Sequence, residues 1–226
     1  MRSVTEFIDH LAAGESVKYL LFWGHKPRRD GTIGASCLSQ WWPAEFTVEG
    51  TTFRTAEHYM MWRKALLFED PATAEQVVAA DHPSQAKALG RKIAGFDEKR
   101  WEEHRFEIVT TASTAKFAQH GDLLTYLRGT GDRVLVEASP VDRVWGIGLA
   151  ADDPAAQDPA RWRGLNLLGF ALMAARAALR ADPRPPQTET LEPRAARDCY
   201  GDRTIRISRT ALRSGGVTAT HEQRNG

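Results

Sequence analysis

Hydrophobic residues in this chain mark a few short strands among longer stretches that have the spacing of helices. The continuous apolar runs at 18–23 (KYLLFW) and 134–136 (VLV) end at a glycine and before a Ser-Pro pair, and each predicts a buried strand. Residues 46–48 and 51–53 flank a Glu-Gly pair, which predicts a small hairpin with glycine in its turn.

Helices are expected over most of the remaining sequence up to residue 180. Thr55 and Asp97 are suited to cap two of them, and two prolines are well placed in first turns. We expect helices at 1–14, 55–68, 71–80, 83–93, 98–119, 123–127 and 167–180. The segment 110–114 (TTAST) has weak helix propensity and predicts a kink or break in the longest helix. Residues 25–43 predict a long loop, and loops of that size in compact domains are often functional.

Beyond Ala181 the sequence changes character. Several prolines follow, and then a stretch rich in Arg, Thr, Ser and Gly in which only 204–207 alternates like a strand. We therefore predict a domain at 1–180 and a largely disordered tail, rich in Arg and Pro, at 181–226.

Length and composition fit one globular domain. The chain has 226 residues, of which 42% are hydrophobic and 26% charged. The net charge of +1 gives no global electrostatic signal for nucleic acid or for an anionic membrane. No apolar run approaches the ~20 residues of a membrane helix, and the first residues lack the features of a signal peptide. We expect a cytoplasmic protein with no membrane partner.

Glu57 and Lys64 are the charged residues that most need an explanation. They are seven residues apart in a mostly apolar predicted helix, so their side chains point from nearly the same stripe, ~10 Å apart along the axis. Buried charges are costly unless they are paired or used. A simpler interpretation is that Glu57 is a first-turn acid favoured by the helix dipole and that Lys64 reaches solvent.

Seven short blocks of this sequence resemble, in order, those of the NADAR family, also called YbiA-like. The resemblance covers roughly residues 18–180. The blocks are 39–43 (SQWWP), 55–59 (TAEHY), 86–91 (AKALGR), 115–117 (AKF), 135–140 (LVEASP), 142–148 (DRVWGIG) and 162–169 (WRGLNLLG).

The resemblance implies a single compact α+β domain, predominantly helical with a few short strands. It also implies hydrolysis of an N-glycosidic bond between ribose and an amino group on a heterocycle. Two substrate classes are implied: phosphoribosylamino-pyrimidine intermediates of riboflavin synthesis, and ADP-ribose on the guanine amino group of nucleic acid. A link to NAD and ADP-ribose metabolism leaves a third interpretation open, a non-catalytic module that binds ADP-ribose or an NAD derivative.

That chemistry needs a group for the developing positive charge and a proton for the departing nitrogen. An alternative route captures the opened sugar as a Schiff base on a desolvated lysine. In this family setting we predict Glu57, Lys64 and Asp142 as catalytic: Glu57 for protons or charge, Lys64 as the reactive amine, and Asp142 to orient a ribose hydroxyl or the attacking water. Lys116 is the rival for the reactive amine.

The predicted substrate-binding residues come from several segments and complete the candidate site. Trp145 beside Gly146 suits stacking on a flat base, because glycine lets the ligand approach closely. Asn166 is explained as a helix N-cap, with a ligand contact as the second interpretation. An Arg fork suits a phosphate, which favours Arg28 in the long loop. The remaining members of the set are Trp23, Gly24, Trp42 and Lys116.

No metal site and no cofactor are predicted. The histidines lack a zinc spacing such as H-E-x-x-H, and the pair Gly146 and Gly148 lacks the third glycine of a dinucleotide fingerprint. The expected partner is a small ribosylamine substrate or, alternatively, ADP-ribosylated nucleic acid. The two substrates are not distinguished by the sequence.

Overall fold

The structure, a computed structural model, describes residues 1–181. Within these residues β1 (Tyr19–Phe22) and β4 (Val134–Glu137) pair in parallel, with Tyr19 opposite Val134 and Phe22 opposite Glu137. The hairpin of β2 (Phe46–Val48) and β3 (Thr51–Phe53) is antiparallel and is confirmed. Both of its turn residues, Glu49 and Gly50, have positive φ (52° and 76°), as two-residue hairpins of the favoured twist require.

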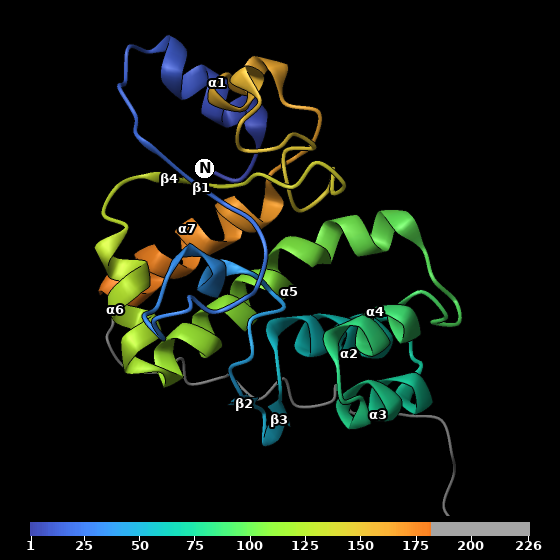
Figure 1. The fold of residues 1–226 in the computed structure, drawn as a ribbon. Helices are drawn as coiled ribbons and strands as arrows, with labels where there is room; N and C mark the ends of the chain where they lie inside the picture. The colour runs from blue at the N-terminus through green and yellow to red at the C-terminus, as the bar shows by residue number, and fades with distance from the viewer. Residues whose placement is uncertain (182–226) are drawn as a thin grey trace, which may run out of the picture. The chain divides into compact units, whose positions relative to one another are not determined.

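Helices make up most of the described chain (Figure 1). They are α1 (Val4–Ala12), α2 (Ala56–Leu67), α3 (Pro71–Ala79), α4 (Pro83–Gly90), α5 (Glu98–Gln119), α6 (Gly121–Gly129) and α7 (Leu167–Ala181), with short 3-10 turns at Ala35–Leu38, Pro154–Gln157 and Pro159–Arg161. The long α5 packs against α7, α2 and α6, while α3 and α4 pack against α2. The predominantly helical α+β fold is thereby confirmed.

Local capping explains where several helices begin. The side chains of Ser3, Thr55, Asp70 and Asp97 accept hydrogen bonds from backbone N–H groups in the first turns of α1, α2, α3 and α5. Each satisfies one of the donors that a helix start leaves without an internal partner, which is worth about 1 kcal/mol. The caps predicted at Thr55 and Asp97 are therefore confirmed.

The predicted break in α5 is wrong. The helix continues from Glu98 to Gln119, and the hydroxyls of Thr110 and Thr114 bond back to the carbonyls one turn earlier, at 2.9 and 2.8 Å, so these polar groups are satisfied within the helix. The small buried Ala112 and Ala115 of the same segment belong to the larger core cluster. Tertiary packing thus overrides weak propensity here.

Other predicted boundaries shift by a few residues. The first helix is shorter than 1–14, α4 ends at Gly90 instead of residue 93, and α6 is longer than 123–127. Apart from Ala181, which ends α7, the predicted tail and the strand-like segment 204–207 lie outside the described residues.

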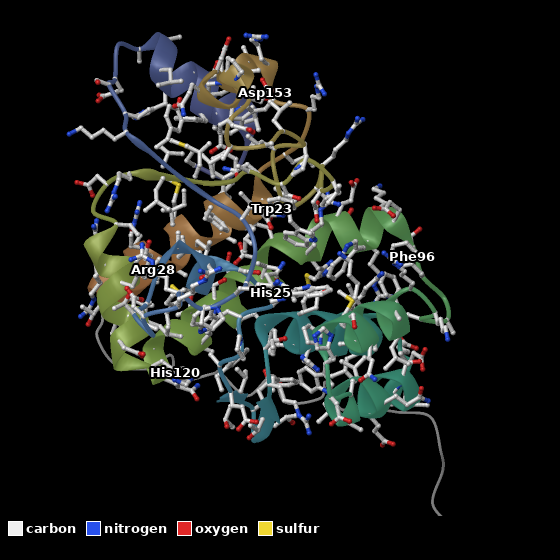
Figure 2. All side chains as sticks on the ribbon, in the orientation of Figure 1. Trp23, His25, Arg28, Phe96, His120 and Asp153 are labelled. Carbon is white, nitrogen blue, oxygen red and sulfur yellow. The ribbon has the colours of Figure 1, made fainter. Side chains whose placement is uncertain are left out.

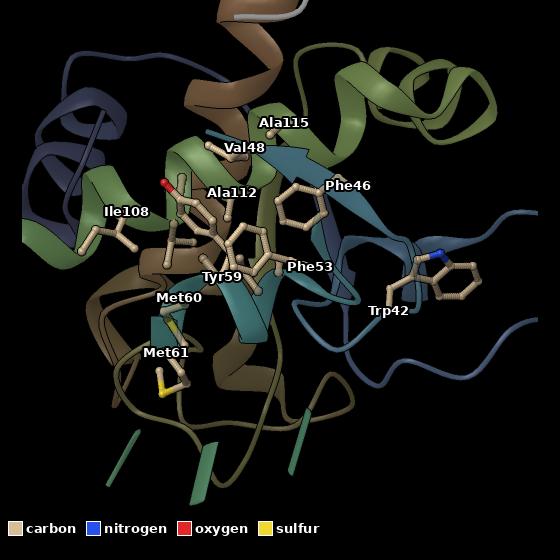
Figure 3. Packing of buried hydrophobic residues seen from close by; sticks show 14 of the residues in the cluster. Trp42, Phe46, Val48, Phe53, Tyr59, Met60, Met61, Ile108, Ala112 and Ala115 are labelled. Carbon is tan, nitrogen blue, oxygen red and sulfur yellow. The ribbon is translucent and has the colours of Figure 1, made fainter. Parts of the chain in front are cut away.

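The core has two parts, and β4 separates them. Because side chains alternate along a strand, Leu135 joins the larger cluster while Val134 and Val136 join the smaller one. Figure 3 shows part of the larger cluster, where Phe53 and Tyr59 meet edge to face with ring centroids 5.2 Å apart. Aromatic pairs of this kind add roughly 0.5 to 1.5 kcal/mol to the burial energy.

The two parallel strands end at the same edge, and this places two loops together. The chain leaves β1 through Trp23 and Gly24, and leaves β4 through Ala138, whose N–H donates to the carbonyl of Phe22 (2.9 Å). Gly24 has a φ of 80°, which favours glycine. Ligands commonly bind where parallel strands end.

No helix within residues 1–181 combines the length and apolar character needed to cross a membrane.

Candidate active site

A cavity of about 310 Å³ lies where the chain leaves β1 and β4. The segment from Ser39 to Trp41, the start of α2 and Lys87 of α4 contribute further parts of its wall. It is lined by Trp23, Gly24, His25, Ser39, Gln40, Trp41, Glu57, Lys87, Glu137, Ser139, Val141, Asp142 and Trp145. The structure therefore brings together five of the residues predicted for the site: Trp23, Gly24, Glu57, Asp142 and Trp145.

Glu57, in the first turn of α2, is a buried carboxyl, with 2% of its surface exposed. Burial raises its pKa to about 7; Lys87 and the side chain of Trp41 oppose the shift, and Asp142 adds to it. Its Oε1 has no hydrogen-bond partner in the described part of the chain. A buried carboxyl in this state is costly for the fold, and it is aimed at a cavity.

Glu137, the last residue of β4, brings a second carboxyl to the same cavity. Burial and, after it, the neighbouring charges of Asp142 and Glu57 together raise its pKa to about 8. The residue as a whole is only part-buried, but its Oε2 is enclosed and has no partner within residues 1–181. Sequence reasoning missed it, although it lies inside the LVEASP block.

The surroundings of the two carboxyls differ. Lys87 is the first opposing charge at both carboxyls. At Glu57 the side chain of Trp41 and the charge of Arg91 also lower the pKa, whereas at Glu137 the charges of Asp142 and Glu57 raise it. The surroundings therefore favour the ionised form more at Glu57 than at Glu137. Such a pair titrates as a unit, with one group able to donate a proton while the other carries charge.

Asp142 serves the fold and the cavity together. Its Oδ1 accepts hydrogen bonds from the N–H groups of Val144 (2.9 Å) and Trp145 (2.8 Å), and this fixes the turn that presents the indole. The residue also lines the cavity. Gly146 does not line it: a Cβ there would lie 2.7 Å from the carbonyl oxygen of Glu137, so this glycine lets the turn pack against β4. The prediction of Gly146 as a ligand contact is corrected accordingly.

Indole rings and an exposed valine surround the entrance. Trp23 is 60% exposed and Val141 85% exposed, and both line the cavity with Trp41 and Trp145. The prediction named Trp42, which is not among the lining residues. Trp42 is buried in the larger core cluster (Figure 3), while Trp41 lines the cavity, with the ring of His25 5.4 Å away.

Comparison with known proteins agrees with this geometry. The NADAR domain profile matches residues 21–180, which is more than half of the chain. The chain belongs to the NADAR family. An N-glycosidase of Acanthamoeba polyphaga mimivirus is 38% identical over 167 residues, covering 72% of this chain and 96% of the viral protein.

Two further relatives extend the comparison. The NMR structure of Escherichia coli YbiA aligns with a TM-score of 0.57 and 26% identity, covering 74% of this chain and 89% of YbiA. A riboflavin biosynthesis protein of Vibrio vulnificus is 33% identical over 111 residues, which are 49% of this chain and 29% of that protein. Family membership and the N-glycosidase relatives make this chain an N-glycosidase enzyme.

In this NADAR domain Lys64 does not line the cavity of Glu57. Two helical turns carry it into a neighbouring cavity, where its Nζ donates to the carbonyl of Gly90 (3.0 Å) and lies 4.1 Å from the centre of the Phe96 ring. Burial lowers the pKa of this amine. The expectation that a ribose fits between Glu57 and Lys64 in one pocket is therefore corrected.

Lys116 is likewise outside the NADAR cavity. Its amine is fully buried and donates to the carbonyls of Cys37 (2.6 Å) and Ser39 (2.9 Å). Burial lowers its pKa to about 7. Its contacts are with the wall behind Gln40 and Trp41, so it supports the cavity and does not face it.

Arg28 and Asn166 also lie away from the cavity lining. Arg28 is exposed, packs beside Gly34 and lies on the side of α6, away from Phe96 (Figure 2). Asn166 is neither a side-chain N-cap nor a lining residue. Its amide donates to the carbonyl of Leu135 and accepts from the N–H of Glu137, both at 3.0 Å, and so holds the end of β4 in place.

Lys87, on α4, is a cation of the NADAR site that was not among the residues predicted for it. The structure places Lys87 in the lining, with its Nζ 5.9 Å from the centre of the Trp41 ring. Among the described residues it is the one lysine that lines the cavity of Glu57.

Proposed function

We propose that this enzyme hydrolyses the N-glycosidic bond between a phosphorylated ribose, as ribose 5-phosphate or ADP-ribose, and an amino group on a heterocycle. A phosphoribosylamino-pyrimidine of riboflavin synthesis is the first substrate to test, because one relative is named a riboflavin biosynthesis protein. The observation that carries the proposal is the pair of carboxyls, Glu57 and Glu137, in a cavity with an indole-rich entrance; each has one buried oxygen without a partner within residues 1–181.

The pair suits both halves of the reaction. Glu137 gives its proton to the departing nitrogen while the bond between that nitrogen and the anomeric carbon breaks, and the bonding electrons stay on nitrogen. Glu57, as the carboxylate, stabilises the positive charge that develops on the sugar ring. Water then adds its hydroxide to the anomeric carbon and its proton to Glu57. Transfer of this proton to Glu137 restores the starting state, with ribose and the free amine as products.

The remaining lining residues have positioning roles in this scheme. The flat heterocycle stacks on an indole of Trp23, Trp41 or Trp145 at the entrance. The oxygen of Asp142 that is not used by the turn is available for a ribose hydroxyl. Lys87 favours ionisation of Glu57, because its positive charge lowers the pKa that burial raises. None of these steps needs Lys64 or Lys116 at the reacting carbon.

The experiment is to compare Glu57→Gln, Glu137→Gln and a matched control, Glu103→Gln, which changes an exposed acid on α5 outside the cavity. We expect kcat for release of ribose 5-phosphate to fall at least about 100-fold in both site variants and to be unchanged in the control. The dissociation constant of the substrate, measured by calorimetry, should change little. Turnover of Glu57→Gln at the wild-type rate would refute the proposal.

Two further measurements test the roles of Glu137 as proton donor and of water as the direct nucleophile. If Glu137 donates the proton, the defect of Glu137→Gln should shrink with substrates whose heterocycle is a better leaving group, whereas that of Glu57→Gln should not. Borohydride added during turnover should leave no adduct on the protein. An adduct that Lys87→Met abolishes would replace the direct attack of water with a Schiff-base route through the one lining lysine.

A further inference from the structure

A second cavity, of about 420 Å³, adjoins the first along α2. Lys64 and the segment from Gly90 to Trp101 form much of its wall. Lys87, Asp142 and Trp145 line both cavities, so the two are neighbours that share one side. Glu57 faces the first cavity and Lys64 the second, two helical turns or roughly 10 Å further on.

The charges around the second cavity do not balance. Its lining holds four cations, Lys64, Lys87, Arg91 and Arg105, against two acids, Asp142 and Glu98, and Glu98 lies 3.9 Å from the guanidinium of Arg105. Arg105 is also paired with Glu102, at 2.9 Å. Three lining cations therefore remain without a carboxylate within 4.0 Å in the described part of the chain: Lys64, Lys87 and Arg91.

The three cations are held so that they face one volume. Lys87 lies in the last turn of α4 and Arg91 is its C-cap residue, still in a helical conformation, so the two lie four residues apart on the same side. Lys64 is fixed between the carbonyl of Gly90 and the ring of Phe96, and two of its three N–H donors are left for a ligand. Phe96 is 42% exposed and lies at the α4–α5 connection (Figure 2). Such a site matches an anion with more than one negative charge.

We propose that the second cavity binds the phosphate carried on C5 of the substrate ribose, with Lys64 and Arg91 as donors and Lys87 at the junction with the first cavity. This rests on the proposed function, because it places the sugar at Glu57 and its phosphate further along the same face of α2. It also gives Lys64 a binding role in place of the catalytic one. Ribose 5-phosphate and ADP-ribose share this chemistry, since both carry a phosphate on C5 of the ribose.

The experiment measures binding by calorimetry, so that it does not depend on turnover. The probes are ribose 5-phosphate, ADP-ribose and unphosphorylated ribose. The variants are Arg91→Gln, which changes an exposed side chain and should fold normally, and a control, Lys92→Gln, whose exposed neighbouring cation lines neither cavity. A second variant, Lys64→Gln, tests the buried end of the site.

We expect Arg91→Gln and Lys64→Gln to weaken binding of ribose 5-phosphate and ADP-ribose by about tenfold or more, with Lys92→Gln unchanged. Binding of ribose should be the same in all variants. Loss for only one phosphorylated probe also supports the site and identifies the source of its phosphate. Equal binding in Arg91→Gln and Lys92→Gln for both probes would overturn the proposal.

The two proposals fail separately. If Arg91→Gln loses affinity for ribose 5-phosphate but no ribosylamine is hydrolysed, the phosphate site stands and the proposed function falls. If hydrolysis requires Glu57 but Arg91→Gln has wild-type affinity and KM, the function stands and the phosphate site falls.

Discussion

The carboxyls of Glu57 and Glu137 and the amine of Lys116 are all ionisable groups inside the domain, but the described part of the fold supplies hydrogen-bond partners for the amine and leaves one oxygen of each carboxyl without one. Lys116, 1% exposed, donates to two carbonyls, those of Cys37 and Ser39. Glu57 and Glu137 each keep a carboxyl oxygen without any partner among residues 1–181. A buried polar group that the fold satisfies serves structure, and one that it leaves open is available to a ligand.

The two regions are connected through one short segment. Lys116 holds the carbonyl of Ser39, and the carbonyl of the next residue, Gln40, accepts the N–H of Glu57 (3.0 Å). The hydrogen bonds of Lys116 therefore help to position Glu57. We predict that removing the amine of Lys116 destabilises the protein and that removing the carboxyl of Glu57 stabilises it.

The largest effect is expected from Lys116→Met. The variant should lose roughly 2 to 4 kcal/mol of unfolding free energy, because two buried carbonyls lose their donor. Urea denaturation measures the loss, and Lys99→Met, an exposed lysine on the same helix, is the control that should stay within about 0.5 kcal/mol. Should Lys116→Met be as stable as the wild type, the contrast between the two regions would be lost.

Glu57→Gln should act in the opposite direction and depend on pH. The folded-state pKa of about 7 lies above the usual 4.5, so between these values the folded protein binds a proton that the unfolded chain has released. Unfolding free energy contributed by Glu57 therefore falls as pH rises from about 4.5 to about 7. Removing the carboxyl should stabilise the protein by roughly 1 to 3 kcal/mol at pH 8 and hardly at all at pH 4.5.

Urea denaturation at the two pH values, with Glu103→Gln beside it, checks this prediction. The exposed control should show no pH-dependent gain. A stability gain for Glu57→Gln that is equal at both pH values would mean that the negative charge of Glu57 does not destabilise the folded protein.

The smallest effect concerns Gln40, a third group that lines the cavity and has a partnerless buried oxygen, Oε1. Gln40→Met removes this oxygen with little change in shape, and we expect a gain of about 0.5 to 1 kcal/mol. Affinity for the substrate should fall at the same time, as measured by KM. A drop in stability instead would mean that the side chain of Gln40 stabilises the fold and is not an unsatisfied group.

Local signals predicted the fold well, and tertiary packing explains where they did not. The Glu-Gly turn of the hairpin and the caps at Thr55 and Asp97 depend on neighbouring residues, so the sequence shows them directly. The segment 110–114 has weak propensity, but α5 continues through it where Ala112 packs in the core. The residues of that segment alone do not indicate which helices it packs against.

The candidate site was harder to predict because it depends on directions in space. Glu137 looks like an ordinary polar end to a strand until β4 is seen to stop at the cavity. Trp41 and Trp42 are indistinguishable as adjacent letters, yet one lines the cavity and the other packs in the core. Glu57 and Lys64 lie seven residues apart on α2 as the sequence shows, but they line different cavities.

The exposed rim of the cavity has a consequence for the range of substrates. Trp23 and Val141 offer the incoming heterocycle flat and apolar contacts, which respond to the size of a ring and hardly to the pattern of its hydrogen-bonding groups. Under the proposed function the sugar meets the charged groups Glu57, Glu137 and Lys87 of the same cavity. We therefore expect the enzyme to be selective for the glycosyl part of its substrate and tolerant of the base.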